Sequence, residues 1–300
     1  MDLAAADWQL YRSFLAVMQE GSLSGAARKL GLTQPTLGRQ IAQLEQALGL
    51  PLFSRSPAGL EPTAAATTLI PHAEAMASAA QALARAASGA ADETKGTIRL
   101  TASEFMSAEV LPPMLADFQD RHRGIVIELA GSNRVEDLLR RDADLAVRMK
   151  RPAQDALIAK HIGHIPIRMY AHRRYIERRG IPKTLLDLPQ HTVIGFDRDD
   201  SSFRAVGASP FEISRDLFSF RTDDDVVQHA ALRGGVGIGG CQVGVARRNS
   251  DLVPVLHDAI QFTLEMWLVT HEDLKADRRV RLLFDHLSES LTAYAKESAT

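Results

Sequence analysis

The chain has 300 residues, of which 45% are hydrophobic and 24% charged, with a net charge of −2 and one cysteine, Cys241. This length allows about two or three domains, and the near-zero charge excludes a uniformly basic nucleic-acid binder, so any DNA-binding surface must be local. A single cysteine excludes an internal disulfide. No apolar run reaches the ~18 residues of a membrane span, and the first residues lack a signal-peptide pattern. We therefore expect a cytoplasmic protein without membrane contact.

The first fifty residues are predicted to form three short helices. Asp7 is a suitable N-cap for a helix over residues 8–20, which Gly21 ends. Ser24 is the predicted cap of a second helix over residues 25–30.

The third helix is predicted to begin after Thr33, its N-cap, with Pro35 in the first turn, where a missing N–H does no harm. Its buried stripe consists of Leu37, Ile41, Leu44 and Leu48. Two helices joined by a short turn that contains glycine describe a helix-turn-helix, in which the N-terminal part of the second helix enters the major groove of DNA.

Polar side chains at the start of that third helix are of the types that contact DNA. Glutamine pairs with adenine edges, arginine pairs with guanine edges, and threonine or proline contacts a thymine methyl. A hairpin pattern follows over residues 50–63, and Arg55 on it can reach a phosphate. The alternative is an ordinary helical hairpin with a solvated polar face. The candidate DNA contacts are Ser24, Thr33, Gln34, Pro35, Thr36, Arg39, Gln40 and Arg55.

Residues 64–95 are predicted to form a linker helix that pairs with a second copy of the chain. A heptad seam consists of Leu69, Ala73, Met76, Ala80, Leu83 and Ala87. We expect Pro71, which lies inside this seam, to kink or restart the helix. The alternative is a helix packed on its own domain. A dimer would present two recognition helices to a pseudo-palindromic double-stranded DNA site.

Beyond residue 96, predicted strands alternate with helices, which indicates a parallel sheet with helices on both faces. The predicted strands cover residues 97–103, 125–129, 143–149, 165–172, 192–196, 218–222 and 262–271, with further candidates in VGIGG and LVPVL, and the predicted helices cover 108–121, 135–141, 224–233 and 280–296. We divide this part into lobe I (96–161 and 268–300) and lobe II (162–267), with a ligand cleft between them.

Ligands in such folds bind at the carboxyl ends of strands. The candidate effector contacts near such ends are Ser103, Glu104, Ser132, Arg148, Phe196, Thr222 and Asp223. Thr222 or Asp223 is also the predicted cap of the helix that follows.

Several patterns that resemble catalytic, cofactor or metal sites are interpreted as structural. Gly235–Gly240 satisfies G-x-G-x-x-G, but a helical stretch precedes it and a strand follows, the reverse of a dinucleotide site. His161 and His164 have no evident carboxylate or cysteine partner, and a lone Cys241 beside an apolar strand is typical of a core residue. We therefore expect no catalytic residue, cofactor or metal.

The segment SLSGAARKLGLTQPTLGRQIAQLEQALGLPLFSRSPAGLEPT, residues 22–63, resembles the winged helix-turn-helix of LysR-type transcriptional regulators. Weaker similarity continues through TASEF, LPPML, DLAVR and HAALRGGVGIG. The resemblance implies a homo-oligomer, a dimer or tetramer joined by linker helices, and an α/β two-lobed effector domain like periplasmic binding proteins. It implies DNA contacts from Gln34, Pro35, Thr36 and Arg39.

The function predicted from these features is DNA-binding transcription regulation controlled by a small-molecule effector, without catalysis, and RNA polymerase is a further candidate partner. The alternative from another class is a small-molecule-binding α/β enzyme with an N-terminal helical interaction module.

Overall fold

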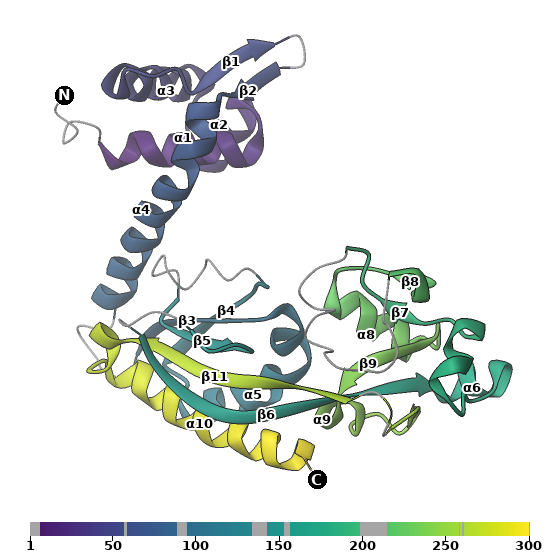
Figure 1. Ribbon diagram of the computed structural model, residues 1–300. Helices are drawn as coiled ribbons and strands as arrows, with labels where there is room; N and C mark the ends of the chain where they lie inside the picture. The colour runs from purple at the N-terminus through teal and green to yellow at the C-terminus, as the bar shows by residue number, and fades with distance from the viewer. Residues whose placement is uncertain are drawn as a thin grey trace. The chain divides into compact units, whose positions relative to one another are not determined.

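The computed structural model describes residues 7–56, 59–88, 95–133, 143–152, 157–198, 215–257, 259 and 261–299. The chain divides into an N-terminal unit that extends to Ala86 and a C-terminal unit that begins at Ala87 (Figure 1). Among the described helices, none combines the length and apolar character that crossing a bilayer requires.

The N-terminal unit begins with three helices, α1 (Trp8–Glu20), α2 (Leu23–Leu30) and α3 (Gln34–Leu48). The Asp7 side chain caps α1 by accepting from the Gln9 N–H, and Gly21 ends that helix in the left-handed conformation, as predicted. The predicted start of α2 was wrong. Its cap is Ser22, whose side chain accepts from the Gly25 N–H at 3.1 Å, and Ser24 lies inside the first turn.

The core of this unit is made by the apolar faces of its helices. Phe14 of α1 and Leu37 and Leu44 of α3 are buried, while Leu48, at the end of the predicted stripe, is partly exposed. A single apolar face on α3 leaves its opposite face, with the polar residues of its first turns, in solvent.

A β-hairpin, β1 (Phe53–Ser56) paired with β2 (Gly59–Pro62), follows α3 as predicted. The side chain of Glu45 holds it against the helix, because its Oε1 accepts from the Leu52 and Phe53 N–H groups at 2.7 and 3.1 Å. The hairpin is therefore fixed to α3 by a charge-assisted pair of hydrogen bonds.

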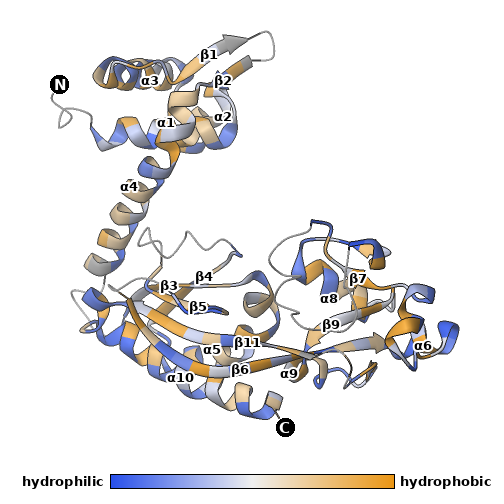
Figure 2. Cartoon of the chain, viewed as in Figure 1, coloured by the Kyte–Doolittle hydropathy of each residue, from blue (hydrophilic) through white to orange (hydrophobic). Residues whose placement is uncertain are grey.

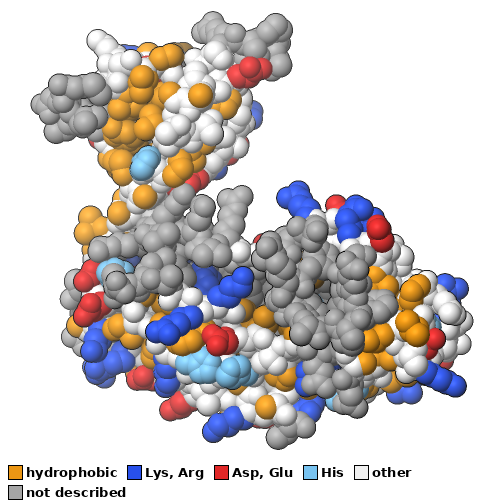
Figure 3. Space-filling view, in the orientation of Figure 1, with side chains coloured by type: hydrophobic (Ala, Val, Ile, Leu, Met, Phe, Trp, Pro, Cys, Tyr) orange, Lys and Arg blue, Asp and Glu red, His pale blue; other side chains and the backbone are white. Residues whose placement is uncertain are grey.

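Helix α4 (Ala64–Ser88) runs without interruption past Pro71, so the helix does not restart there. The predicted seam divides into two parts. Ala73 is buried and Leu69 packs against the core of the N-terminal unit, whereas Met76 and Leu83 are 42% and 73% exposed. Figure 3 shows hydrophobic side chains along α4 at the surface.

The strands of the C-terminal unit are β3 (Gly96–Ala102), β4 (Ile125–Gly131), β5 (Leu145–Arg148), β6 (Leu157–His172), β7 (Ile194–Gly195), β8 (Phe220–Arg221), β9 (Ile238–Gln242), β10 (Leu252–Pro254) and β11 (Gln261–His271). Its helical segments are η2 (Met106–Val110), α5 (Leu111–Arg121), α6 (Arg173–Arg179), η4 (Leu185–Gln190), η5 (Arg215–Leu217), α8 (Asp225–Arg233), α9 (Val243–Ala246), η6 (Glu272–Leu274) and α10 (Arg278–Ala299). The helix predicted over 135–141 lies outside the described residues.

Seven strands form one sheet in the order β10-β6-β11-β5-β3-β4, with β9 also paired to β6. The expected parallel sheet was only partly right. Strand β3 is parallel to β4 and β5, but β11 is antiparallel to β5 and β6, and β9 and β10 are antiparallel to β6. The two long strands β6 and β11 therefore join the parallel part to the rest of the unit.

Two buried clusters form the cores of the C-terminal unit. The larger one surrounds β3, β4, β5, β11 and α10, and it also takes in Ala231, Leu232 and Cys241. The smaller one contains Met169, Ala171, Tyr175, Val193, Phe218 and Ile238. Figure 2 shows hydrophobic and hydrophilic residues alternating along α10, as expected for a helix with one face on a sheet. Strand β6 contributes to both cores.

Candidate functional site: a DNA-reading surface and polar strand ends

The first two turns of α3 present most of the predicted DNA-contacting residues. Thr33 caps the helix through its Oγ1, which accepts from the Thr36 N–H at 3.4 Å, and the two threonine hydroxyls lie 2.8 Å apart. Gln34, Pro35 and Arg39 are exposed, and Thr36 is half-buried. Because the buried stripe of α3 faces the core, these side chains share the solvent side of one helix end.

Three predicted contacts, Ser24, Gln34 and Gln40, take part in side-chain hydrogen bonds within the unit. The Ser24 hydroxyl of α2 donates to Gln34 Oε1 at 3.1 Å, which links the two helices at their exposed ends. The buried Ser13 hydroxyl donates to Gln40 Oε1 at 2.6 Å. Gln40 is therefore held partly toward α1, and its amide nitrogen is the group left for an outside partner.

Arg55 lies on β1, where its backbone is opposite Leu60 of β2. Its side chain is outside the described part of the structure. The predicted phosphate contact rests on its place in the hairpin.

In the C-terminal unit, the carboxyl ends of β3 and β4 bring together several predicted effector contacts. The backbone N–H of Ser132 donates to the Ala102 carbonyl at 2.8 Å, and Ser103 Oγ accepts from the Met106 N–H at 3.3 Å. The backbone N–H of Glu104 donates to Asn133 Oδ1 at 3.2 Å, and the Asn133 amide donates to Glu104 Oε2 at 3.4 Å. Sequence reasoning missed Asn133.

The chain continues from β3 into η2, a π-helical turn, a feature frequent at functional sites. Ser107 on this turn lies against Gly131 of β4, where an added Cβ would be 3.4 Å from the Ser107 Cβ. Ser107 Oγ is shielded from solvent and has no hydrogen-bond partner among the described residues. Sequence reasoning missed Ser107 as well, because a serine inside a helical stretch carries no local signal.

Arg148, at the end of β5, belongs to the same edge of the sheet. Its Nη2 donates to Thr101 Oγ1 of β3 at 3.3 Å. The guanidinium thus lies across the neighbouring strand, at the edge that carries Ser103 and Ser132.

The other predicted effector contacts gather at the ends of β7 and β8. The Thr222 N–H donates at 3.0 Å to the carbonyl of Gly195, the residue that precedes Phe196. Asp223 Oδ1 accepts from the Asp197 and Arg198 N–H groups at 2.9 and 3.1 Å. The predicted cap of α8 was wrong, because the N-cap is Asp224, whose Oδ1 accepts from the Val226 and Val227 N–H groups.

The glycine-rich segment and Cys241 have structural roles. Helix α8 precedes the glycines and β9 follows them, as predicted, and an added Cβ at Gly237 would lie 2.3 Å from the Thr192 carbonyl oxygen. Cys241 is 2% exposed, and burial raises the pKa of its thiol to about 12. Its Sγ lies 3.6 Å from His229 Nδ1, but at this pKa the thiol stays protonated and is a poor nucleophile.

The expectation that His161 and His164 lack a carboxylate partner was wrong. Glu265 of β11 lies directly opposite His164 of β6, and one ligand atom from each of the three residues falls within 4.8 Å of the others.

Comparison with known proteins identifies both units. A model described as "Bacterial regulatory helix-turn-helix protein, lysR family" matches residues 8–67, and one described as "LysR substrate binding domain" matches residues 91–292. The chain belongs to the LysR family. It is therefore a DNA-binding transcriptional regulator with an effector-binding domain, and the alternative of an enzyme is set aside because this is a family of regulators.

Relatives of this LysR-family chain cover almost its whole length. It is 26% identical over 292 residues to a probable HTH-type transcriptional regulator, LtrA, of Klebsiella pneumoniae, with 93% of each chain covered. The structure of CrgA from Neisseria meningitidis matches with a TM-score of 0.60 at 23% identity, covering 94% of this chain and 98% of that one. Full-length CbnR in complex with its target DNA matches with a TM-score of 0.65 at 18% identity, covering 95% and 99%. These structural likenesses show the fold.

Proposed function

We propose that this LysR-family regulator reads a pseudo-palindromic double-stranded DNA site with the N-terminal end of α3. Gln34 and Arg39 contact base edges, Pro35 and Thr36 contact the sugar–phosphate backbone or thymine methyls, and Thr33, Ser24 and Gln40 support them. The observation that carries the proposal is the exposure of Gln34, Pro35 and Arg39 together at a helix end that has a capped, ordered first turn. Arg55 on the β1–β2 hairpin adds a phosphate contact.

The charge balance of the first 66 residues restricts any attraction to DNA to local contacts. Acidic and basic residues balance over the first 66 residues, so attraction to DNA in general is weak and specific contacts carry much of the affinity. The positive end of the α3 dipole also favours a nearby phosphate.

Pairing of α4 with a second copy supplies the two-fold symmetry of the site. The support is the exposure of Met76 and Leu83, because large apolar side chains on a solvent-facing helix are stabilised by a partner. Ala80 lies between them on the same seam and is also exposed, and its small side chain lets a second helix approach closely.

The effector binds between lobe I (96–161 and 268–300) and lobe II (162–267), at the polar strand ends. The smaller core lies wholly within lobe II, which supports this division. The unsatisfied Ser107 hydroxyl supports a ligand at the ends of β3 and β4, since a shielded polar group without a partner is costly. The effector is a small molecule with hydrogen-bonding groups, contacted by Ser103, Glu104, Ser132, Arg148, Phe196, Thr222 and Asp223. Its binding alters the spacing of the recognition helices, with RNA polymerase as the further partner and the cytoplasm as the compartment.

Selection from a randomised duplex library tests the DNA-reading part. Arg39→Ala should relax base preference at one position of each half-site, at a cost of about 1–3 kcal/mol there. Arg12→Ala removes an exposed arginine from α1 as the matched control and should leave the selected sequence unchanged. Identical selected sequences for Arg39→Ala and the wild type would remove Arg39 from the base-reading set.

A further inference from the structure

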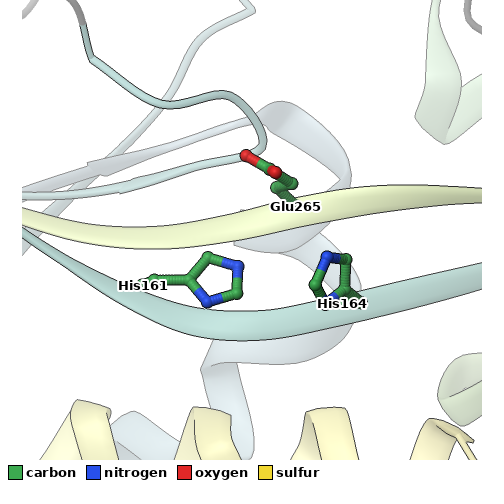
Figure 4. A group of neighbouring side chains, drawn as sticks. All are labelled: His161, His164 and Glu265. Atoms are coloured by element: carbon green, nitrogen blue, oxygen red, sulfur yellow. The ribbon is translucent and has the colours of Figure 1, made fainter.

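A cluster of two histidines and a glutamate lies on the exposed face of the β6–β11 pair. His161 and His164 come from β6 and Glu265 comes from β11 (Figure 4). All three side chains are exposed, and one ligand atom from each lies within 4.8 Å of the others. The two imidazole rings have centroids 5.1 Å apart. None of these three residues is among those assigned to DNA or effector binding, but Arg148 of β5 lies opposite Trp267 of β11, their neighbour.

The cluster exists because of an irregularity in the strand pairing. Residues three apart in a regular strand point to opposite faces of a sheet. Here His164 is opposite Glu265, and Gly163 is opposite Met266. The next residue of β11, Trp267, is opposite His161 and not Ile162. Ile162 is therefore an extra residue on β6. The extra residue restores His161 to the face of His164, as β-bulges re-aim side chains.

Packing on the other face explains how this bulge is accommodated. Ile162 is buried in the larger core of the C-terminal unit. Gly163 faces α10, where an added Cβ would lie 3.0 Å from the Cβ of Ala295. Ile162 and Gly163 thus turn inward, and the two histidines turn outward beside Glu265.

We propose that His161, His164 and Glu265 bind a divalent transition-metal ion, with Zn²⁺ as the best match. Two imidazoles and one carboxylate are a donor set that zinc accepts in tetrahedral geometry, with the fourth position open to water or to a ligand from outside. Mg²⁺ and Ca²⁺ prefer oxygen ligands and fit this set poorly. Bonds of about 2 Å would draw the ligand atoms closer than they are now. The exposed side chains have the rotamer freedom for that movement.

Trp267 is placed to orient the ligands. Its Nε1–H donates to Glu265 Oε2 at 3.0 Å, and its ring centroid lies 4.8 Å from that of His161. Hydrogen bonds to metal-binding carboxylates fix their direction and raise affinity. The guanidinium of Arg151 lies over the Trp267 ring, 5.6 Å from its centroid. The carboxylate supplies the negative charge that offsets this neighbouring cation.

Isothermal titration of the full-length, tag-free, chelator-treated protein with Zn²⁺ tests the proposal. We expect one equivalent of saturable binding per chain. His161→Gln/His164→Gln should abolish it, and Trp267→Phe should weaken it by about ten- to a hundredfold through the lost hydrogen bond. The matched control is His72→Gln/His257→Gln, which removes two exposed imidazoles elsewhere and should bind like the wild type.

Mg²⁺ titrated in place of Zn²⁺ should give no saturable heat. Far-UV circular dichroism of each variant checks that the fold is retained, which we expect because the two histidines are exposed. Absence of saturable Zn²⁺ binding by the wild type, or equal loss of binding in the control pair, would overturn the proposal.

Discussion

Removing the Ser22 hydroxyl should destabilise the N-terminal unit, whereas removing the Ser24 hydroxyl should not. Ser22 Oγ accepts from the Gly25 N–H at 3.1 Å and so satisfies one backbone N–H at the start of α2. Because Ser22 is exposed, Ser22→Ala leaves no cavity. Loss of a serine cap costs about 1 kcal/mol. In a unit of this size such a loss lowers the Tm by about 4–8 °C.

Ser24→Ala is the matched control, because it removes a hydroxyl two residues away whose hydrogen bond, to Gln34, joins two exposed side chains. The chain has two tryptophans. In a Trp267→Phe background, thermal unfolding followed by the fluorescence of Trp8 therefore reports on the N-terminal unit alone. An equal or larger fall in Tm for Ser24→Ala would refute the assignment of Ser22 as the cap and would place the start of α2 at Gly25.

The double variant Met76→Glu/Leu83→Glu should split the oligomer, as measured by size-exclusion chromatography with light scattering. Gln81→Glu, on the same exposed part of α4, is the control and should leave the oligomer intact. Elution of the double variant at wild-type size would refute the predicted seam. Cys241, whose pKa burial raises to about 12, should resist iodoacetamide at neutral pH until the chain is unfolded in urea, and rapid labelling of the native protein would contradict its core position. Burial, opposed by Glu109, lowers the pKa of His229 below its ordinary value of 6.5. The unfolded chain therefore takes up that proton first as the pH falls below 6.5, and the free energy of unfolding of the C-terminal unit should fall with it. Urea unfolding should show a shallower pH dependence for His229→Gln, and an unchanged slope would contradict this.

Local signals predicted the N-terminal unit well. Capping residues and glycines mark the ends of α1 and α3, and the spacing of Leu37 and Leu44 marks the buried face, so the exposed cluster around Gln34 follows from the sequence. The misplaced start of α2 shows the limit of such signals, because Ser22 and Ser24 are equally good caps by type.

Features that depend on distant partners were not predictable. The antiparallel pairing of β6 with β11 joins segments about a hundred residues apart, and nothing within either strand indicates its direction. For the same reason Glu265 could not be connected with His164, and the spacing of His161 and His164 hides that they share a face. Ser107 became visible as a candidate ligand contact only through its burial beside Gly131.

Selection of fragmented genomic DNA by the full-length protein at physiological salt, followed by sequencing, tests the central claim most directly. The predicted result is enrichment of a short inverted repeat whose half-sites lie about one helical turn, or a multiple of it, apart. Repeating the selection with Gln34→Ala/Arg39→Ala should lose that enrichment. Uniform recovery of fragments that disappears as salt is raised, with no common sequence, would contradict the account that the exposed end of α3 reads DNA.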